Sequence, residues 1–356
     1  MSDEARKHLD PATIAVRASG EHNLNEGITP PIYVASTFVH SGVPVPGDYT
    51  YGRGDSPANE PLERTLAQLE GGLDCVVFNA GIAAANALLE EALPGTALVM
   101  PRDAYYGIRN RAQRELTWRG VDVRLVDQTD LGAVEQALEG ASLMWAETPT
   151  NPLLAIADLE AIGKLAAAKG VPWAVDNTFA TPLLQQPMQF GAVASMHSLT
   201  KYVGGHSDLL LGAVITSSDA IAARLRSRRN DTGTQGDGFS LWLARRGLQT
   251  MPLRVARQSE SAAELSQRLR GHPSIETVFY PGLKDHPGHE VAAGQMCGGF
   301  GGMLSILVRG GQEAAQRTVE RCQVWVPATS LGGVESLIER RARWAGETAP
   351  PELLRL

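Results

Sequence analysis

Cysteine is scarce in this chain of 356 residues, which contains only Cys75, Cys297 and Cys322. The odd number and the lack of a Cys-x-x-Cys pair argue against a disulfide framework and favour a reducing compartment. The sequence also lacks an apolar stretch long enough to span a bilayer, and its first residues lack the hydrophobic core of a signal peptide. We therefore expect a soluble, cytoplasmic protein that does not enter a membrane.

Positive charge is not in excess, because 32 basic residues stand against 39 acidic ones and give a formal net charge of −7. This balance argues against a nucleic-acid or acidic-membrane partner. The densest basic run, at residues 224–229, is predicted to be a solvated helix end. A metal site is not expected, since His286 and His289 lie in a predicted loop without acidic or cysteine ligands beside them.

Three regions differ in their patterning. Residues 1–60 have many prolines and glycines and no periodicity, which predicts an extended N-terminal arm that needs another surface to order it. In residues 61–230 helical segments alternate with predicted strands at 75–79, 97–100, 121–126, 142–146, 172–176, 192–196 and 211–216. This alternation predicts an α/β domain with a mostly parallel sheet covered on both faces. Residues 231–356, with a long helical region and strands near 277–280, 303–308 and 324–326, are expected to form a smaller C-terminal α+β domain.

Lysine is rare, with five residues in the whole chain, and one of them has an unusual setting. Lys201 closely follows the hydroxyl side chains of Ser198 and Thr200, and Asp176 ends an apolar run upstream. Such a lysine can bind an aldehyde cofactor covalently, the hydroxyls can bind phosphate, and the carboxylate can keep a pyridine nitrogen protonated. The pattern is typical of a pyridoxal phosphate enzyme.

Other candidate residues follow neighbouring predicted strands, where ligands of α/β sheets bind. Gly81 opens a helix whose free amides can bind phosphate, and Tyr105 and Asn151 follow two further strands. Each has a simpler structural interpretation when taken alone. Asp176 would be a helix cap, Ala80-Gly81 a tight turn, Tyr105 a packing residue and Asn151 a turn former. Their convergence on one sheet edge favours a site.

The chain resembles the Cys/Met-metabolism pyridoxal phosphate enzymes, the family of cystathionine γ-synthase and cystathionine γ-lyase. The resemblance extends from Ala12 to the last residue. The motifs that carry it lie at 148–152 (Thr-Pro-Thr-Asn-Pro), 175–179 (Val-Asp-Asn-Thr-Phe), 197–202 (His-Ser-Leu-Thr-Lys-Tyr), 205–208 (Gly-His-Ser-Asp) and 330–336 (Ser-Leu-Gly-Gly-Val-Glu-Ser). It implies pyridoxal phosphate fold type I, similar to aspartate aminotransferase, with pyridoxal 5'-phosphate as cofactor and a small-molecule amino-acid substrate.

The resemblance also implies residue roles. Lys201 would carry the cofactor as a Schiff base and act as the catalytic base, and Tyr105 would stack on the ring. We expect Tyr105 also to protonate the departing sulfur, with a pKa lowered by a nearby cation. The implied cofactor-binding residues are Lys201, Asp176, Gly81, Ile82, Tyr105, Asn151, Ser198 and Thr200, joined by Tyr51 and Arg53 of a neighbouring subunit. The implied substrate-binding residues are Arg355, Ser330, Asn151 and Thr329.

The implied assembly is a homotetramer, a dimer of dimers whose active sites are shared between subunits. The chain departs from the family pattern at three places. Tyr106 stands where the family has glycine, and Thr329 stands where many members have glutamate. The family continues beyond Leu356 into a closing helix, so we expect the C-terminal domain to lack the last elements.

The Thr329-Ser330 pair and residues 339–344 are similar to a bacterial branch usually called cystathionine γ-lyase. This resemblance favours α,γ-elimination of L-cystathionine to cysteine, 2-oxobutanoate and ammonia. The alternative is cystathionine γ-synthase, which joins cysteine to an O-acyl-homoserine. A cofactor-binding but inactive homologue is a third hypothesis, and a lysine-dependent aldolase without cofactor is a fourth.

Overall fold

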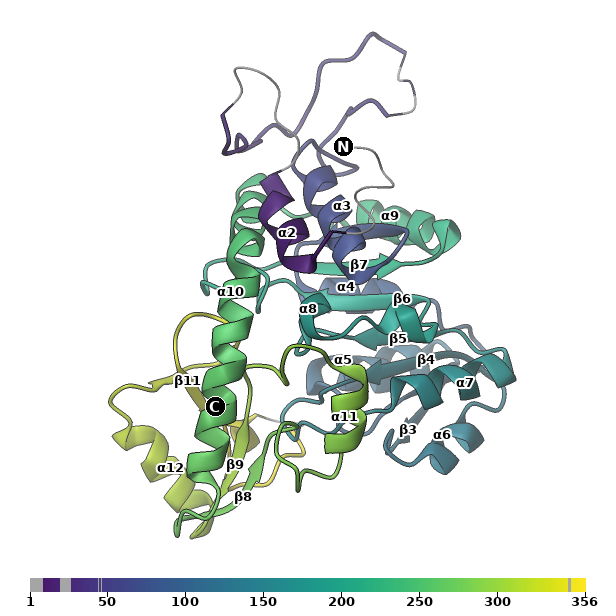
Figure 1. Ribbon diagram of the computed structural model, residues 1–356. Helices are drawn as coiled ribbons and strands as arrows, with labels where there is room; N and C mark the ends of the chain where they lie inside the picture. The colour runs from purple at the N-terminus through teal and green to yellow at the C-terminus, as the bar shows by residue number, and fades with distance from the viewer. Residues whose placement is uncertain (1–8, 20–26, 44, 46, 345–346) are drawn as a thin grey trace.

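The computed structural model describes residues 9–19, 27–43, 45, 47–344 and 347–356 (Figure 1). Its centre is a sheet in the order β1-β7-β6-β5-β4-β2-β3, in which β7 runs antiparallel to its neighbours and the other pairings are parallel. The strands are β1 (Asp74–Phe78), β2 (Ala97–Pro101), β3 (Asp122–Val126), β4 (Ala141–Glu147), β5 (Trp173–Asp176), β6 (Ala194–Ser198) and β7 (Gly212–Thr216). The mostly parallel sheet is as predicted, and each predicted strand agrees to within two residues.

Helices cover both faces of this sheet, because its strands are apolar on both sides (Figure 1). They are α3 (Asn59–Glu70), α4 (Gly81–Leu89), α5 (Tyr106–Arg111), α6 (Leu131–Ala137), α7 (Leu159–Lys169), α8 (Thr181–Leu184) and α9 (Asp219–Thr232). Capping sets several boundaries. The Asp158 carboxylate accepts the backbone N–H of Ala161 at the start of α7, and Gly170, at φ 66°, ends that helix.

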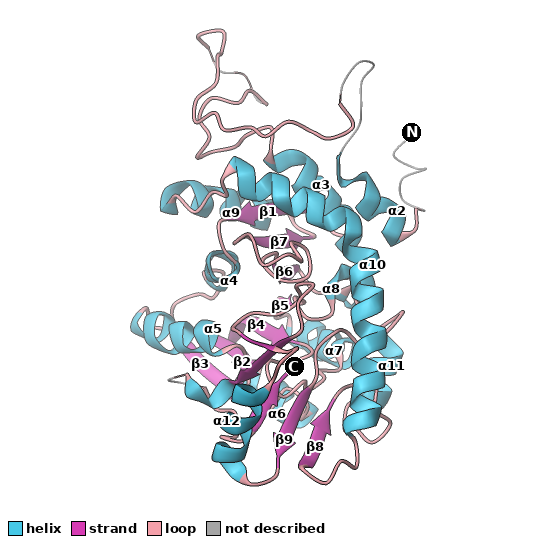
Figure 2. Ribbon diagram, turned by 90° about the vertical axis from the view of Figure 1, so that its left-hand side faces the viewer, coloured by secondary structure: helices cyan, strands magenta, loops and turns pink. Residues whose placement is uncertain are grey.

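The smaller C-terminal sheet lies below the central one, and the long helix α10 (Gly238–Leu269) runs from α2 and α3 down to it (Figures 1 and 2). Its strands, in the order β10-β11-β12-β9-β8, are β8 (Ile275–Phe279), β9 (Ser305–Val308), β10 (Val326–Pro327), β11 (Leu337–Arg340) and β12 (Leu353–Arg355). Helices α11 (His289–Gln295) and α12 (Gly311–Arg321) complete this part. Strands β11 and β12 are additions to the sequence prediction.

The predicted N-terminal arm lies partly outside the described residues, which omit 1–8, 20–26, 44 and 46. A helix not expected from the sequence, α2 (Pro11–Val16), packs against α10 of the same chain, where Gln249 Nε2 donates to the Val16 carbonyl at 3.1 Å. The described residues between 27 and 55 extend above the body as irregular loops (Figure 1).

The basic run at 224–229 lies on α9 and only part of it is solvated. Arg224 has a side chain that is 50% exposed, but the Arg229 side chain is fully buried and donates to Glu63 Oε1 at 2.8 Å. The prediction of a solvated helix end is therefore wrong for Arg229, because a buried carboxylate on α3 compensates its charge.

Candidate active site

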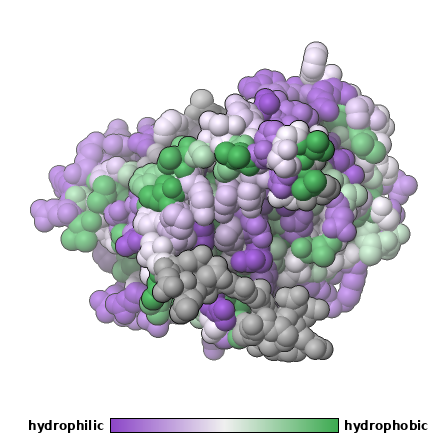
Figure 3. Space-filling view, turned by 90° about the horizontal axis from the view of Figure 1, so that it is seen from above, coloured by the Kyte–Doolittle hydropathy of each residue, from purple (hydrophilic) through white to green (hydrophobic). Residues whose placement is uncertain are grey.

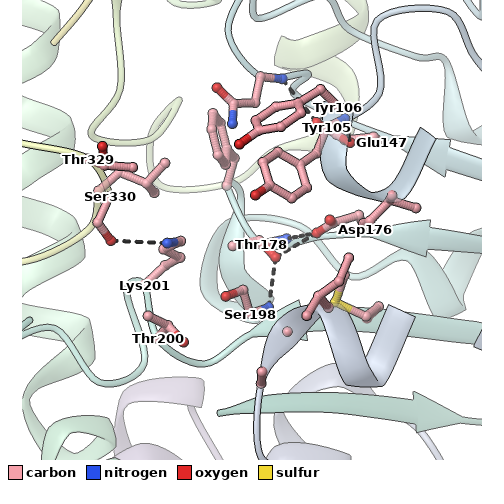
Figure 4. Close-up of a pocket in the computed structure, with 18 of the residues that line it drawn as sticks. Tyr105, Tyr106, Glu147, Asp176, Thr178, Ser198, Thr200, Lys201, Thr329 and Ser330 are labelled. Atoms are coloured by element: carbon pink, nitrogen blue, oxygen red, sulfur yellow. Dashed lines mark hydrogen bonds between the residues drawn. The ribbon is translucent and has the colours of Figure 1, made fainter. Parts of the chain in front are cut away.

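A cavity of about 250 Å³ lies at the carboxyl ends of the central strands, against the loop that precedes β11. It brings together residues predicted from distant parts of the sequence: Gly81, Ile82, Tyr105, Asn151, Asp176, Ser198, Thr200, Lys201, Thr329, Ser330 and Arg355. Figure 4 shows the two tyrosines projecting into this space opposite Lys201 and Ser330. Tyr51 and Arg53 do not line the cavity, because both lie on the arm.

Lys201 follows β6 in a tight turn, in which its backbone N–H donates to the Ser198 carbonyl at 3.1 Å. Its Nζ atom donates to Ser330 Oγ at 3.0 Å (Figure 4). Burial, with the nearby guanidinium groups of Arg355 and Arg341, lowers the pKa of Lys201 to about 8. An appreciable fraction of this amine is therefore neutral, and hence nucleophilic, near neutral pH.

Asp176 is the last residue of β5 and is buried. Its Oδ1 atom accepts the backbone N–H of Thr178 at 3.0 Å and the Thr178 hydroxyl at 2.5 Å. Burial raises the pKa of Asp176, while these hydrogen bonds and the charges of His197 and Lys201 oppose that shift. In the part of the chain that the structure describes, no hydrogen bond reaches Oδ2, so a cationic N–H beside it would find an acceptor.

The start of α4 forms the opposite end of the cavity. The amides of Gly81 and Ile82 precede the first intrahelical hydrogen bonds and are available to an anion. A Cβ atom at Gly81 would lie 2.8 Å from Ser198 Oγ, so glycine permits this close approach. The Thr200 hydroxyl instead donates to the Leu211 carbonyl at 3.2 Å, which engages its hydrogen within the protein.

Tyr105 is positioned by Glu147, a buried carboxylate at the end of β4. Glu147 Oε2 accepts the backbone N–H of Tyr105 at 2.8 Å, and Oε1 accepts that of Asn151 at 3.0 Å. Glu147 is in register with Asp176 on the adjacent strand. Burial and the nearby Asp176 carboxylate raise the pKa of Glu147 well above its ordinary value.

The pKa of Tyr105 differs from the sequence prediction. Burial raises the pKa of this phenol, followed by the effect of Tyr106, while Arg341 and Arg355 act in the opposite direction. The expected lowering by a cation is thus outweighed by the loss of solvent. Tyr105 consequently keeps its proton near neutral pH, which is the state that a proton donor requires.

Arg355 is buried on β12 and held by three acceptors. Nη1 donates to Asn151 Oδ1 at 3.3 Å, and Nη2 donates to the Ser330 carbonyl at 2.7 Å and to Glu339 Oε2 at 2.8 Å. Ser330 itself has a φ of 118°, a conformation that non-glycine residues seldom adopt. These contacts fix a planar cation at the cavity wall, where a carboxylate would be bound.

Thr329 is tied to the same buried carboxylate. Its hydroxyl donates to Glu339 Oε1 at 2.8 Å, and Arg343 Nη2 donates to the Thr329 hydroxyl at 3.0 Å. Trp344 Nε1 also donates to Glu339 Oε1 at 2.8 Å. Burial and the surrounding cations act in opposite directions, and the net result is a pKa of about 2 for Glu339. Thr329 itself carries no charge, and its hydroxyl hydrogen is already donated to Glu339.

A buried carboxylate on α3 supports the strand ends from behind. Glu70 Oε1 accepts from Asn177 Nδ2 at 3.0 Å and lies 3.2 Å from His197 Nε2. The Ser195 hydroxyl also donates to Glu70 Oε1. These bonds connect α3 with the residues beside Asp176 and so hold the edge of the sheet that carries the site.

Sequence reasoning did not assign a role to Glu147, Glu339 or Arg341. Glu147 ends a predicted strand, which was a usable signal for a site residue. Glu339 and Arg341 lie in a charged segment whose strand was not predicted, so nothing in the pattern indicated that these residues are buried beside the cavity.

Comparison with known proteins now identifies the family. Residues 12–353 match the family described as Cys/Met metabolism PLP-dependent enzyme. This chain belongs to that family. Cystathionine gamma-synthase of Mycobacterium leprae is 43% identical over 96% of this chain and 89% of that protein.

Two solved structures are closely similar. The metB protein of Corynebacterium glutamicum superposes with a TM-score of 0.94 at 38% identity, over 98% of this chain and 94% of that one. Cystathionine gamma lyase (CalE6) of Micromonospora echinospora gives 0.92 at 36% identity, over 98% and 94% of the two chains. The fold, with its mostly parallel sheet and smaller C-terminal sheet domain, is that of these enzymes. The chain is a pyridoxal phosphate-dependent trans-sulfuration enzyme of cysteine and methionine metabolism whose substrate is a small molecule, an amino acid.

The cavity fits this cofactor. Lys201 supplies an amine for its aldehyde, Asp176 has a carboxylate oxygen for the pyridine nitrogen, and the amides at the start of α4 suit a phosphate. Within the described residues no group of three or more histidine, cysteine, aspartate or glutamate side chains could hold a metal ion, and no helix is long and apolar enough to cross a membrane.

Proposed function

We propose that this protein is a cystathionine γ-lyase, which converts L-cystathionine and water into cysteine, 2-oxobutanoate and ammonia. The observation that carries the proposal is that one cavity is lined by a lysine of lowered pKa, a protonated phenol and a buried arginine. A base, an acid and a carboxylate anchor are the groups that an α,γ-elimination requires. The sequence at 339–344, similar to bacterial γ-lyases, favours this reaction.

In the proposed elimination each cavity residue would have a separate role. Pyridoxal phosphate, when bound, supplies a protonated ring that withdraws electrons from the substrate Cα. Arg355 would bind the α-carboxylate, with Ser330 and Asn151 beside it. Lys201 would remove the proton from Cα and, once it has given that proton up and is neutral again, would remove one from Cβ. Tyr105 would stack on the ring and donate its proton to the sulfur that leaves the γ carbon, since burial keeps this phenol protonated.

The remaining cofactor contacts follow from position. We assign the phosphate to the amides of Gly81 and Ile82 with the Ser198 hydroxyl, because these groups face one end of the cavity. Thr200 would donate to the phosphate only after its hydroxyl has rotated away from the Leu211 carbonyl, to which its hydrogen is donated. Asn151, held by Glu147, would contact the phenolic oxygen of the ring.

Cystathionine γ-synthase is the second candidate, and the name of the Mycobacterium leprae relative favours it. In that reaction the Cγ–O bond of an O-acyl-homoserine would break, its acyloxy group would leave as the free carboxylate, and the sulfur of cysteine would then form a bond to the γ carbon. The same lysine, tyrosine and arginine would serve.

Substrate assays separate these reactions. Purified cofactor-loaded protein is given L-cystathionine alone, or O-succinyl- or O-acetyl-homoserine with cysteine. Formation of 2-oxobutanoate from cystathionine supports the γ-lyase. Cystathionine synthesis without that cleavage contradicts the proposal in favour of the synthase, and no turnover with either substrate indicates a cofactor-binding but inactive homologue.

The site would be completed by a second copy of the chain. Tyr51 is 53% exposed on the arm, and Arg53 lies over its ring at 5.5 Å from the centroid. Val34 and Val39 are 85% and 102% exposed, and hydrophobic side chains lie among polar ones on this upper face (Figure 3). We assign the arm to a neighbouring subunit of a homotetramer, where Tyr51 and Arg53 would reach the phosphate. The boundaries 1–60, 61–230 and 231–356, and the cytoplasmic location, stay predictions.

A further inference from the structure

Arg341 is a second buried arginine that lines the cavity together with Arg355. Its side chain is 2% exposed and makes two ion pairs, from Nη1 to Glu339 Oε2 at 3.0 Å and from Nη2 to Glu347 Oε2 at 2.7 Å. Its guanidinium carbon lies 5.7 Å from the centroid of the Tyr106 ring. The guanidinium is thus held by carboxylates and an aromatic face at a fixed place in the cavity wall.

The donors of Arg341 exceed the acceptors around it. A guanidinium has five N–H groups. Two carboxylates take bonds from its Nη atoms, while the buried Nε atom has no hydrogen-bond partner within the described part of the chain. The Nε atom is enclosed by the protein, so a ligand in the cavity would be bound by the N–H groups of Nη1 and Nη2 that the two carboxylates leave unused.

The charges of the cavity favour an anion there. Lys201, Arg355 and Arg341 all line it, and both arginines help to lower the pKa of the lysine. The acidic residues that line the cavity, Glu147 and Asp176, end β4 and β5, where the cofactor ring is placed. Arg355 is assigned to the α-carboxylate, which leaves Arg341 as a cation without a role in the proposed reaction.

Thr329 determines what kind of group Arg341 would meet. It adds no negative charge to the cavity, and its hydroxyl hydrogen is donated to Glu339. A cationic group at the far end of a substrate would therefore have no carboxylate at position 329 to bind it. A carboxylate at the far end could instead be bound by Arg341.

We propose that Arg341 binds a second carboxylate of the substrate, distant from the reacting amino acid. The enzyme would thereby select amino acids with a carboxylate at each end, such as cystathionine, over methionine or homocysteine, which have none at the far end. This inference rests on the proposed function for the placement of the α-carboxylate at Arg355. A planar guanidinium held on three sides suits a bidentate carboxylate contact.

The test is equilibrium binding of two unreactive ligands to the cofactor-loaded enzyme by calorimetry. L-2-Aminosuberate has the chain length of cystathionine with a far carboxylate, and L-2-aminooctanoate has the same length without it. Arg341→Met should raise the Kd of the aminosuberate tenfold or more and change that of the aminooctanoate less than twofold. Arg340→Met is the matched control, because Arg340 donates to Gln316 on α12 and does not line the cavity; it should change neither.

Equal weakening of both ligands by Arg341→Met, or no weakening of either, would overturn the inference. Melting temperatures check folding, and if Arg341→Met does not fold, Arg341→Lys keeps the charge but loses the planar fork. That variant should weaken the aminosuberate alone. Neither ligand has a leaving group at the γ carbon, so their affinities do not depend on turnover. An enzyme that binds aminosuberate through Arg341 yet leaves cystathionine intact contradicts the proposed function and not this assignment.

Discussion

Individual buried charges set the protonation states in the cavity. Removal from water disfavours the charged form of Lys201, and the guanidinium groups of Arg355 and Arg341 act in the same direction, which brings its pKa to about 8. For Tyr105 the same loss of water raises the pKa. One buried environment thus yields a lysine that can accept a proton and a phenol that can donate one.

The pH dependence of cofactor capture follows from Lys201. Because the neutral amine attacks the aldehyde, the rate at which apoprotein binds pyridoxal phosphate should rise with pH to a midpoint near 8 and then level off. The ordinary pKa is 10.5, so an unperturbed lysine would still be gaining rate well above pH 9. Stopped-flow absorbance measures the rate of pyridoxal phosphate binding at each pH. Arg355→Met, which removes a nearby positive charge, should move the midpoint to higher pH, and an unchanged midpoint would contradict the assigned cause.

How well residue roles could be predicted depended on sequence context. Lys201 and Asp176 stood out because hydroxyl and acidic side chains followed predicted strands, and the structure brings these residues to one cavity. The direction in which the pKa of Tyr105 shifts could not be predicted, because it depends on how much solvent the fold removes from around the phenol. Arg341 gave no signal, since it belongs to a run of charged residues that resembles an exposed surface.

At the scale of elements, the hydrophobic pattern of the strands explains which of them could be predicted from the sequence and which could not. The apolar strands of the central sheet were predictable because burial on both faces requires continuous hydrophobic runs. Strands β11 and β12 are short and contain Glu339, Arg340 and Arg355, so they lack such a run. Their pairing places Glu339 opposite Arg355, and the two side chains form an ion pair at 2.8 Å that a search for hydrophobic runs does not reveal.

The start of α4 is predicted to be the phosphate site, and glycine is needed there. Gly81→Ala would place a Cβ atom 2.8 Å from the Ser198 side chain, displacing the hydroxyl or the helix start. We expect the affinity for pyridoxal phosphate to fall about tenfold or more, which corresponds to about 1.4 kcal/mol. Fluorescence titration of apoprotein measures it. Gly294→Ala in α11 is the control, because nothing lies within 4 Å of its added Cβ; similar affinities of the two variants would count against the assignment.

Strand β11 depends on Glu339, whose carboxylate contacts Arg341 and Arg355 in the interior. Glu339→Gln leaves these cations without their counter-charge and should lower the free energy of unfolding by about 3–5 kcal/mol. Chemical denaturation measures the change. Glu335→Gln, at an exposed carboxylate that accepts from Ser207, is the control and should change it by less than about 0.5 kcal/mol.

The pH dependence of this contribution has a defined sign. The pKa of Glu339 is about 2 in the folded protein, below its ordinary value of 4.5. The contribution of the Glu339 carboxylate to the free energy of unfolding is therefore complete above pH 4.5, and it is lost as the pH falls from 4.5 towards 2. The difference in stability between wild type and Glu339→Gln should shrink over this range, and a difference that stays constant would contradict the lowered pKa.

At the scale of the whole molecule, the proposed role of the exposed arm makes a testable prediction about how subunits share the active site. Lys201→Ala and Arg53→Met should each be inactive or strongly impaired alone. Mixed under conditions that exchange subunits, they should regain activity, because the Arg53→Met subunit supplies Lys201 and the other supplies Arg53. Turnover of cystathionine measures the recovery. Absence of recovery after verified subunit exchange would indicate that the arm serves its own chain.

The most direct test of the account is chemical trapping of the cofactor. Protein loaded with pyridoxal phosphate is reduced with borohydride and digested, and mass spectrometry locates the phosphopyridoxyl group. We expect the label on Lys201 among the five lysines, with none on the Lys201→Ala variant. A label on another lysine, or equal labelling of the variant, would contradict the placement of the cofactor between Asp176 and the start of α4.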